Sequence, residues 1–92
     1  MADEFKLHRQ RASGQEAQRL WENSMIQEFF TDMENEIRDG WRSTKADEHD
    51  VREQIYLKML NFEDFKQKFK TRMATGKLAA RELLELEEKR KR

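Results

Sequence analysis

Apolar side chains recur every three or four positions between residues 24 and 42. The members of this stripe are Ile26, Phe29, Phe30, Met33, Ile37 and Trp41. At roughly 100° per residue they fall within an arc of about 120°, and Glu28, Asp32 and Asn35 lie outside it. The spacing predicts an amphipathic helix over residues 24–42. Gly40 lies inside the stripe, where it either ends the helix or lets a neighbouring backbone approach closely.

A second and longer pattern predicts a helix over residues 47–74, with Gly76 as its stop signal. Its main stripe consists of Val51, Ile55, Met59, Phe62, Phe65, Phe69 and Met73. A second stripe, confined to the first half and roughly opposite, consists of Tyr56, Leu57 and Leu60. A helix with two apolar faces has two neighbours. One is the helix over 24–42; the other is the first helix, the last helix or another chain.

The two ends of the chain predict shorter helical arms. Ser13 followed by Glu16 forms a capping box, which predicts a short helix within an arm over residues 1–22. Ser24 and Gln27 form a second capping box at the next helix, and one continuous, kinked helix is the alternative. Residues 77–90 predict a fourth helix with a basic end that suits a helix C-terminus.

The polar stretch "RSTKADEHD" predicts the turn between the two long helices. A connection of about 2–8 residues between helices favours antiparallel neighbours. We therefore expect an all-α fold in one domain, residues 1–92: an antiparallel helical hairpin of two long amphipathic helices with short helical arms at both ends. Because two long helices bury little apolar area, self-association into a larger bundle is the natural remedy.

The composition agrees with helices. Of the 92 residues 36% are hydrophobic and 41% are charged, and there is no proline. Proline would cost about 3 kcal/mol in a helix interior, so its absence leaves long helices uninterrupted. Disorder is the competing interpretation, but six Phe and two Trp at regular spacing argue against it.

The charge balance bears on partners. Lys and Arg number 19 and so do Asp and Glu, so the whole chain lacks the electrostatic footprint of a nucleic-acid or membrane-surface protein. No apolar run approaches the roughly 18 residues that a membrane span needs. The start "MADEFKLHRQ" has no apolar core segment and is unlike a signal peptide, so we expect a soluble, intracellular protein without a membrane partner.

One segment departs from this balance, because residues 66–77 hold basic side chains and no acidic ones. Interleaved lysines and aromatics raise nucleic-acid binding as an alternative function. The candidate contacts, which include the terminal KRKR, are Lys66, Lys70, Lys77, Lys89 and Arg90. Base stacking requires exposed rings, however, and Phe62, Phe65 and Phe69 occupy the apolar stripe. Charge pairing across the hairpin is the simpler explanation.

Other candidate chemistry fails on spacing. "ATGK" resembles the end of a phosphate-binding loop, but Thr71 replaces the first glycine and Leu78 replaces the Ser or Thr. "DEHD", residues 47–50, points its side chains in divergent directions along a helical turn and is typical of a solvated helix start. Without cysteine, disulfides and thiol chemistry are excluded. We expect no enzyme activity, no metal and no cofactor.

The residues expected to matter are therefore those that pack. The expected core or interface stripe is Ile26, Phe30, Met33, Ile37, Trp41, Ile55, Phe62, Phe65 and Phe69. The expected partner face is Trp21, Tyr56, Leu57 and Leu60. Tryptophans such as Trp21 and Trp41 are large enough to anchor an interface, although both also match the core periodicity.

Most of the chain resembles a group of small helical proteins found in tailed bacteriophages and prophages. The group carries "EF-x-x-H/Q-Q-R", then "A-Q-R-L-L-x-N", a tryptophan near the end of the next long helix, and a late "G-K-x-A". The matching residues here are Glu4, Phe5, His8, Arg9, Gln10, Arg11, Ala17, Gln18, Arg19, Leu20, Asn23, Trp41, Gly76, Lys77 and Ala79. Trp21 departs from the usual leucine, and Ser24 stands where proline is common.

The resemblance implies a phage-encoded accessory protein and supplies no catalytic residues. We expect a protein that self-associates or binds another protein through its apolar stripes. Virion assembly, packaging or modulation of a host protein would each fit, with localisation in the host cytoplasm or the virion.

Overall fold

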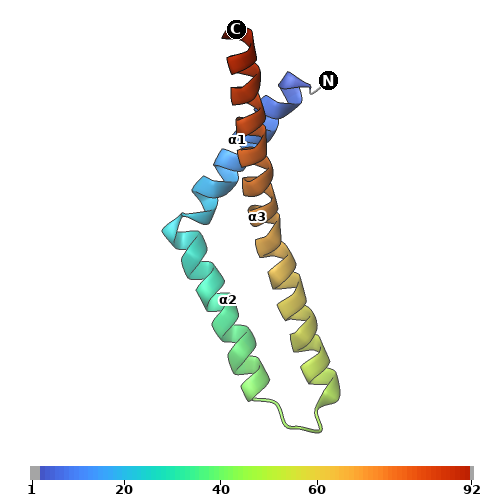
Figure 1. Cartoon of the computed structure of the whole chain (residues 1–92). Helices are drawn as coiled ribbons and strands as arrows, with labels where there is room; N and C mark the ends of the chain where they lie inside the picture. Colours follow the sequence, from blue (N-terminus) through green and yellow to red (C-terminus); the bar gives the residue numbers. More distant parts are fainter. Residues whose placement is uncertain (1–2, 92) are drawn as a thin grey trace. The chain divides into compact units, whose positions relative to one another are not determined.

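The computed structural model describes residues 3–91, which form three α-helices (Figure 1). These are α1 (Glu4–Trp21), α2 (Ser24–Arg42) and α3 (His49–Lys91). No described residue lies in a strand, so the predicted all-α class is confirmed. The helix α2 spans the residues predicted for it, whereas the helices before and after it are longer than predicted.

The chain divides into two compact units. The central unit is Glu22–Gln67, and the terminal unit combines Met1–Trp21 with Lys68–Arg92. The long helix α3 contributes its first part to the central unit and its remainder to the terminal unit.

In the central unit, α2 packs beside the first part of α3 (Figure 1). The ring of Phe30 meets Phe62 edge-on, with centroids 5.7 Å apart, and Phe65 lies 6.1 Å away in a similar geometry. Such edge-to-face pairs add about 0.5–1.5 kcal/mol to the area that the rings bury. Phe30 and Phe62 are the buried residues of this unit.

The helix α2 begins at a cap that the sequence prediction placed one residue too late. The side chain of Asn23 accepts hydrogen bonds from the backbone N–H groups of Met25 and Ile26, at 2.9 and 3.1 Å. These bonds satisfy donors that a helix start leaves free, so Asn23 rather than Ser24 is the cap. The predicted capping box of Ser24 with Gln27 is therefore wrong.

The turn between α2 and α3 is closed by its own side chains. The hydroxyls of Ser43 and Thr44 donate to the carbonyls of Asp39 and Trp41, at 2.8 and 2.6 Å. The backbone N–H of Lys45 donates to the carboxylate of Glu48 at 2.7 Å, immediately before α3 begins. Serine, threonine and acidic residues suit this role because their side chains bond readily to nearby backbone.

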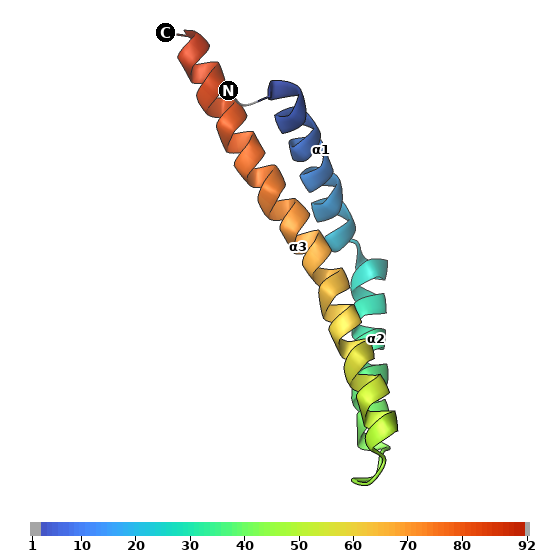
Figure 2. The ribbon, with the colours of Figure 1, turned by 90° about the vertical axis from the view of Figure 1, so that its right-hand side faces the viewer.

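In the terminal unit, α1 crosses the last part of α3 in the view of Figure 1 and lies beside it in the view turned by 90° (Figure 2). The contact centres on Gly14 and Gly76, both of which are buried. A methyl group added at Gly14 would lie 2.6 Å from the Cα of Gly76 and 2.8 Å from the carbonyl oxygen of Arg72. The two backbones therefore touch, and Leu7, Ala17 and Ala79 are buried in this unit.

The terminal unit corrects two predictions made from the sequence. Gly76 does not end a helix: its φ is not positive, α3 continues to Lys91, and the separate helix over 77–90 does not exist. Ser13 does not start a helix, because Asp3 caps α1 by accepting from the backbone N–H of Phe5 at 3.0 Å. The hydroxyl of Ser13 instead accepts a hydrogen bond from Arg72 at 3.1 Å.

Substituting the glycines tests the crossing. Alanine favours a helix over glycine by roughly 0.5–1 kcal/mol, but forcing a methyl group between two backbones costs typically 1–3 kcal/mol. We therefore expect Gly76→Ala and Gly14→Ala each to lower the free energy of unfolding, measured by urea titration with circular dichroism.

The matched control is Gly40→Ala. A methyl group at Gly40 would meet only the side chain of Ile55, at 3.6 Å, which is an ordinary contact. This variant should gain up to about 1 kcal/mol from helix propensity alone. Equal stability changes at Gly40 and Gly76 would contradict the crossing.

Candidate functional site

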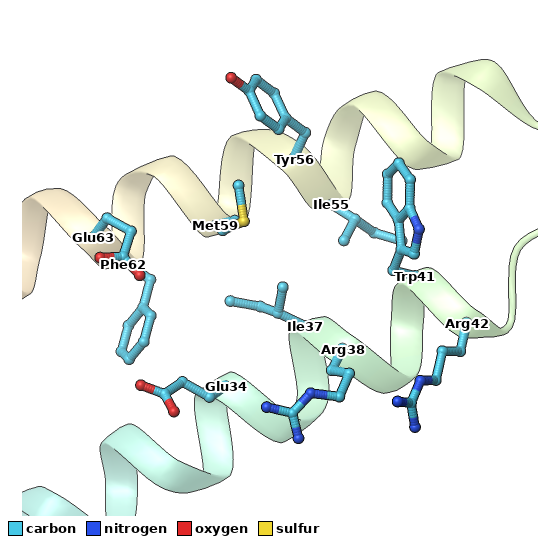
Figure 3. Close-up of a pocket in the computed structure, with 10 residues that line it drawn as sticks. All are labelled: Glu34, Ile37, Arg38, Trp41, Arg42, Ile55, Tyr56, Met59, Phe62 and Glu63. Carbon is cyan, nitrogen blue, oxygen red and sulfur yellow. The ribbon is translucent and has the colours of Figure 1, made fainter.

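The central unit carries an open groove of about 560 Å³ between α2 and the first part of α3 (Figure 3). Its walls combine apolar side chains with charged ones. The lining residues are Glu34, Ile37, Arg38, Trp41, Arg42, Ile55, Tyr56, Met59, Phe62 and Glu63.

The floor of the groove is apolar and its rim is exposed. Ile37 and Phe62 project between the two helices (Figure 3). Trp41 is 45% exposed and Tyr56 is 51% exposed, one on each helix. Aromatic rings that keep half their surface in water are the side chains that most often anchor protein interfaces.

The ring of Trp41 is held in place by Arg52. The guanidinium lies 4.8 Å from the ring centroid, and its Nε donates a hydrogen bond of 2.8 Å to the hydroxyl of Thr44. A cation over an indole ring contributes about 0.5–1 kcal/mol at an exposed site. The turn thus fixes Arg52, and Arg52 in turn fixes the ring at this end of the groove.

The other end of the groove is organised by Lys66. Its ammonium group lies 3.2 Å from a carboxylate oxygen of Glu34, 3.4 Å from one of Glu63, and 4.8 Å from the ring centroid of Phe62. Desolvation by burial, the largest single effect, lowers the pKa of Lys66, but the hydrogen bonds and charges of Glu34 and Glu63 together raise it above its ordinary value. Lys66 therefore ties the two helices together.

The groove therefore carries opposite charges at its two ends. The basic end comprises Arg42 and Arg52, with Arg38 one helical turn nearer the middle of the groove, whereas at the acidic end Glu34 and Glu63 outnumber Lys66 (Figure 3). Figure 3 shows the two carboxylates of the acidic end and Arg42 at opposite ends of the view. This difference between the two ends would orient a partner whose own ends carry the opposite charges.

A second groove, of about 440 Å³, shares Ile37, Ile55 and Phe62 with the first. Its other apolar walls are Met33, Gly40 and Phe65. The central unit thus leaves apolar surface open on more than one side of its packing seam.

The expected core stripe is only partly enclosed. Two of its members, Phe30 and Phe62, are buried. Those that are half-buried are Ile26, Ile37, Ile55 and Phe69. Those that are exposed are Met33, Trp41 and Phe65. Two helices can shield only the line where they meet, so the margins of the stripe remain in water.

The residues of the expected partner face are distributed over both units. Tyr56 lines the first groove, but Leu57 and Leu60 line neither groove, although both are exposed. Trp21 belongs to the terminal unit, where its half-buried ring lies 5.8 Å from that of Phe69.

The candidate nucleic-acid contacts are distributed over both units. Lys66 is paired with carboxylates in the central unit. In the terminal unit, Lys70 lies 5.9 Å from the ring centroid of Trp21, and Arg90 forms an ion pair with Glu4. The remaining candidates, Lys77 and Lys89, are exposed.

Residues 3–91 contain no group of three or more His, Cys, Asp or Glu side chains placed to hold a metal ion. None of the described helices is both long enough and apolar enough to cross a membrane.

The role of Arg52 was not anticipated from the sequence. Trp41 ends the apolar stripe of α2 just before the turn over residues 43–48, and Arg52 lies in the first turn of α3 just after it. Their closeness to the turn on adjoining helices is the signal that could have suggested the contact, because an arginine near a tryptophan is a recognisable cation–π pair.

Comparison with known proteins adds no relative: no family model, no curated protein and no solved structure matches the chain.

The pairing of Lys66 makes stability depend on pH. A raised pKa in the folded state means that the charge stabilises fully below the unfolded value, about 10.4, and that this contribution is lost as pH rises through the folded pKa. Lys66→Met keeps the apolar stem and removes the charge.

We expect the wild type to exceed Lys66→Met in free energy of unfolding by a constant margin up to about pH 9.5, and the margin to shrink above about pH 10.4. Urea titrations of both proteins across this range measure it. A margin that is the same at pH 8 and pH 11 would show that the ion pairs contribute nothing.

Proposed function

We propose that the protein is a non-enzymatic helical protein–protein interaction or assembly protein, and that its central unit supplies the binding surface. The observation that supports this proposal is the open groove, whose aromatic rim, Trp41 and Tyr56, remains about half exposed. Large exposed rings around an apolar floor are costly in water unless a partner covers them.

The proposal rests on the antiparallel hairpin expected from the sequence. Contacts between early residues of α2 and later residues of α3, such as Phe30 with Phe62, agree with it, as does the approach of Arg52 to Trp41 beside the turn. In this arrangement a helix of a partner would lie along the groove and present one apolar face to it. Recognition of an amphipathic helix in an apolar groove is a common mode of peptide binding.

The resemblance to phage accessory proteins extends the proposal. A phage-encoded protein of this kind would act in virion assembly or packaging, or would modulate a host protein, in the host cytoplasm or the virion. Nucleic-acid binding is less well supported, because Lys66, Lys70 and Arg90 each already have a partner within their own unit.

Site-specific photo-crosslinking tests the proposal. A photoreactive phenylalanine analogue replaces Tyr56 on the groove rim or, as a control of equal exposure on the same helix, Leu57 outside it. In cells that produce the protein, we expect a protein adduct of defined mass from position 56 and little from position 57. The readouts are gel mobility and mass spectrometry.

The same analogue at Lys77 examines the alternative. Nucleic-acid adducts from position 77, with no protein adduct from position 56, would overturn the proposal in favour of a nucleic-acid-binding factor. Equal yields from positions 56 and 57 would also overturn it, because they would indicate contact without a defined surface.

A further inference from the structure

We propose that the occupant of the groove is a second copy of the same chain, docked face to face and antiparallel about a two-fold axis. This inference rests on the proposed function and names its partner. The two faces would be related so that the basic end of each groove lies over the acidic end of the other.

The charge pattern carries the proposal. The basic end holds Arg42 and Arg52, and Arg38 lies one helical turn nearer the middle, so the three arginines together carry a charge of about +3 at neutral pH. The acidic end holds Glu34 and Glu63 with Lys66 between them, so its charge is about −1. A groove with one basic and one acidic end can pair with a second, reversed copy of itself, because each end then faces an end of opposite charge.

Symmetry selects between the two ways of stacking the groove on itself. A two-fold axis across the helices reverses the partner and sets each basic end against an acidic end. An axis along the helices sets basic end on basic end, which the arginines oppose. A two-fold interface uses the same patch on both copies. One groove with a basic and an acidic end is therefore enough to specify the antiparallel pairing.

The apolar floor of the groove supplies the surface that docking would bury. Trp41 and Tyr56 of each copy would lose their exposed area to the floor of the other, around Ile37 and Phe62. Apolar burial favours association by roughly 25 cal/mol per Å², and the charges determine the direction of docking.

Charge reversal tests the pairing. The double variant Arg38→Glu with Arg42→Glu changes the summed charge of Arg38, Arg42 and Arg52 from +3 to −1, and Glu63→Lys turns the acidic end from −1 to +1. Each variant alone then sets like charges together twice. We expect each to dimerise at least about tenfold more weakly than the wild type in sedimentation equilibrium.

Mixing the two variants supplies the decisive result. In a mixed pair both contacts join unlike charges again, so a heterodimer should form at near wild-type affinity and appear in native mass spectrometry. A misfolded variant could not be rescued in this way, and circular dichroism of each variant alone confirms its helices. Failure of the mixture to associate, or undiminished dimers of either variant alone, would overturn the antiparallel pairing.

Glutamate substitutions at exposed apolar residues locate the interface. Tyr56→Glu should weaken the dimer at least about tenfold, whereas Leu57→Glu, at a residue 50% exposed and outside the groove, should leave it unchanged. A wild-type chain that stays monomeric at millimolar concentration would overturn self-docking. If position 56 still gave an adduct with another protein, the proposed function would stand and only the self-docking would be overturned.

Discussion

Two helices packed side by side meet along a single line, and the central unit is built within that constraint. The line is closed by the edge-on contact of Phe30 with Phe62. Everything further from it is shielded on one side only, which is why Trp41 and Phe65 remain exposed although both match the apolar period. The open grooves are therefore a direct result of the fold, and the surface available for binding follows from it.

Polar groups determine how that surface is arranged. The turn holds Arg52 over Trp41, and Lys66 joins Glu34 to Glu63 at the opposite end. These interactions are individually worth about 1 kcal/mol or less, so they add little to stability. Their main effect is to fix the positions of rings and charges, and preorganised side chains bind with a smaller loss of entropy.

Periodicity alone was enough to predict the helical class, because an apolar stripe of period 3.6 is the pattern that a helix with one buried face requires. Capping signals were less informative, since Asn23, Ser24 and Ser13 are all plausible caps and only the structure shows which side chain meets the backbone. Gly76 misled most. A glycine after an apolar stripe predicts a helix end, but it serves equally for close packing, and the sequence does not show the opposing Gly14.

The contact of Gly14 with Gly76 has a consequence for how this chain can change. A clash between two side chains can be relieved by trimming either one. Here each glycine meets backbone atoms of the other helix, with no side chain left to shorten. A substitution at one glycine therefore has no suppressor at the other, and any second change that restores the protein must move a helix as a whole.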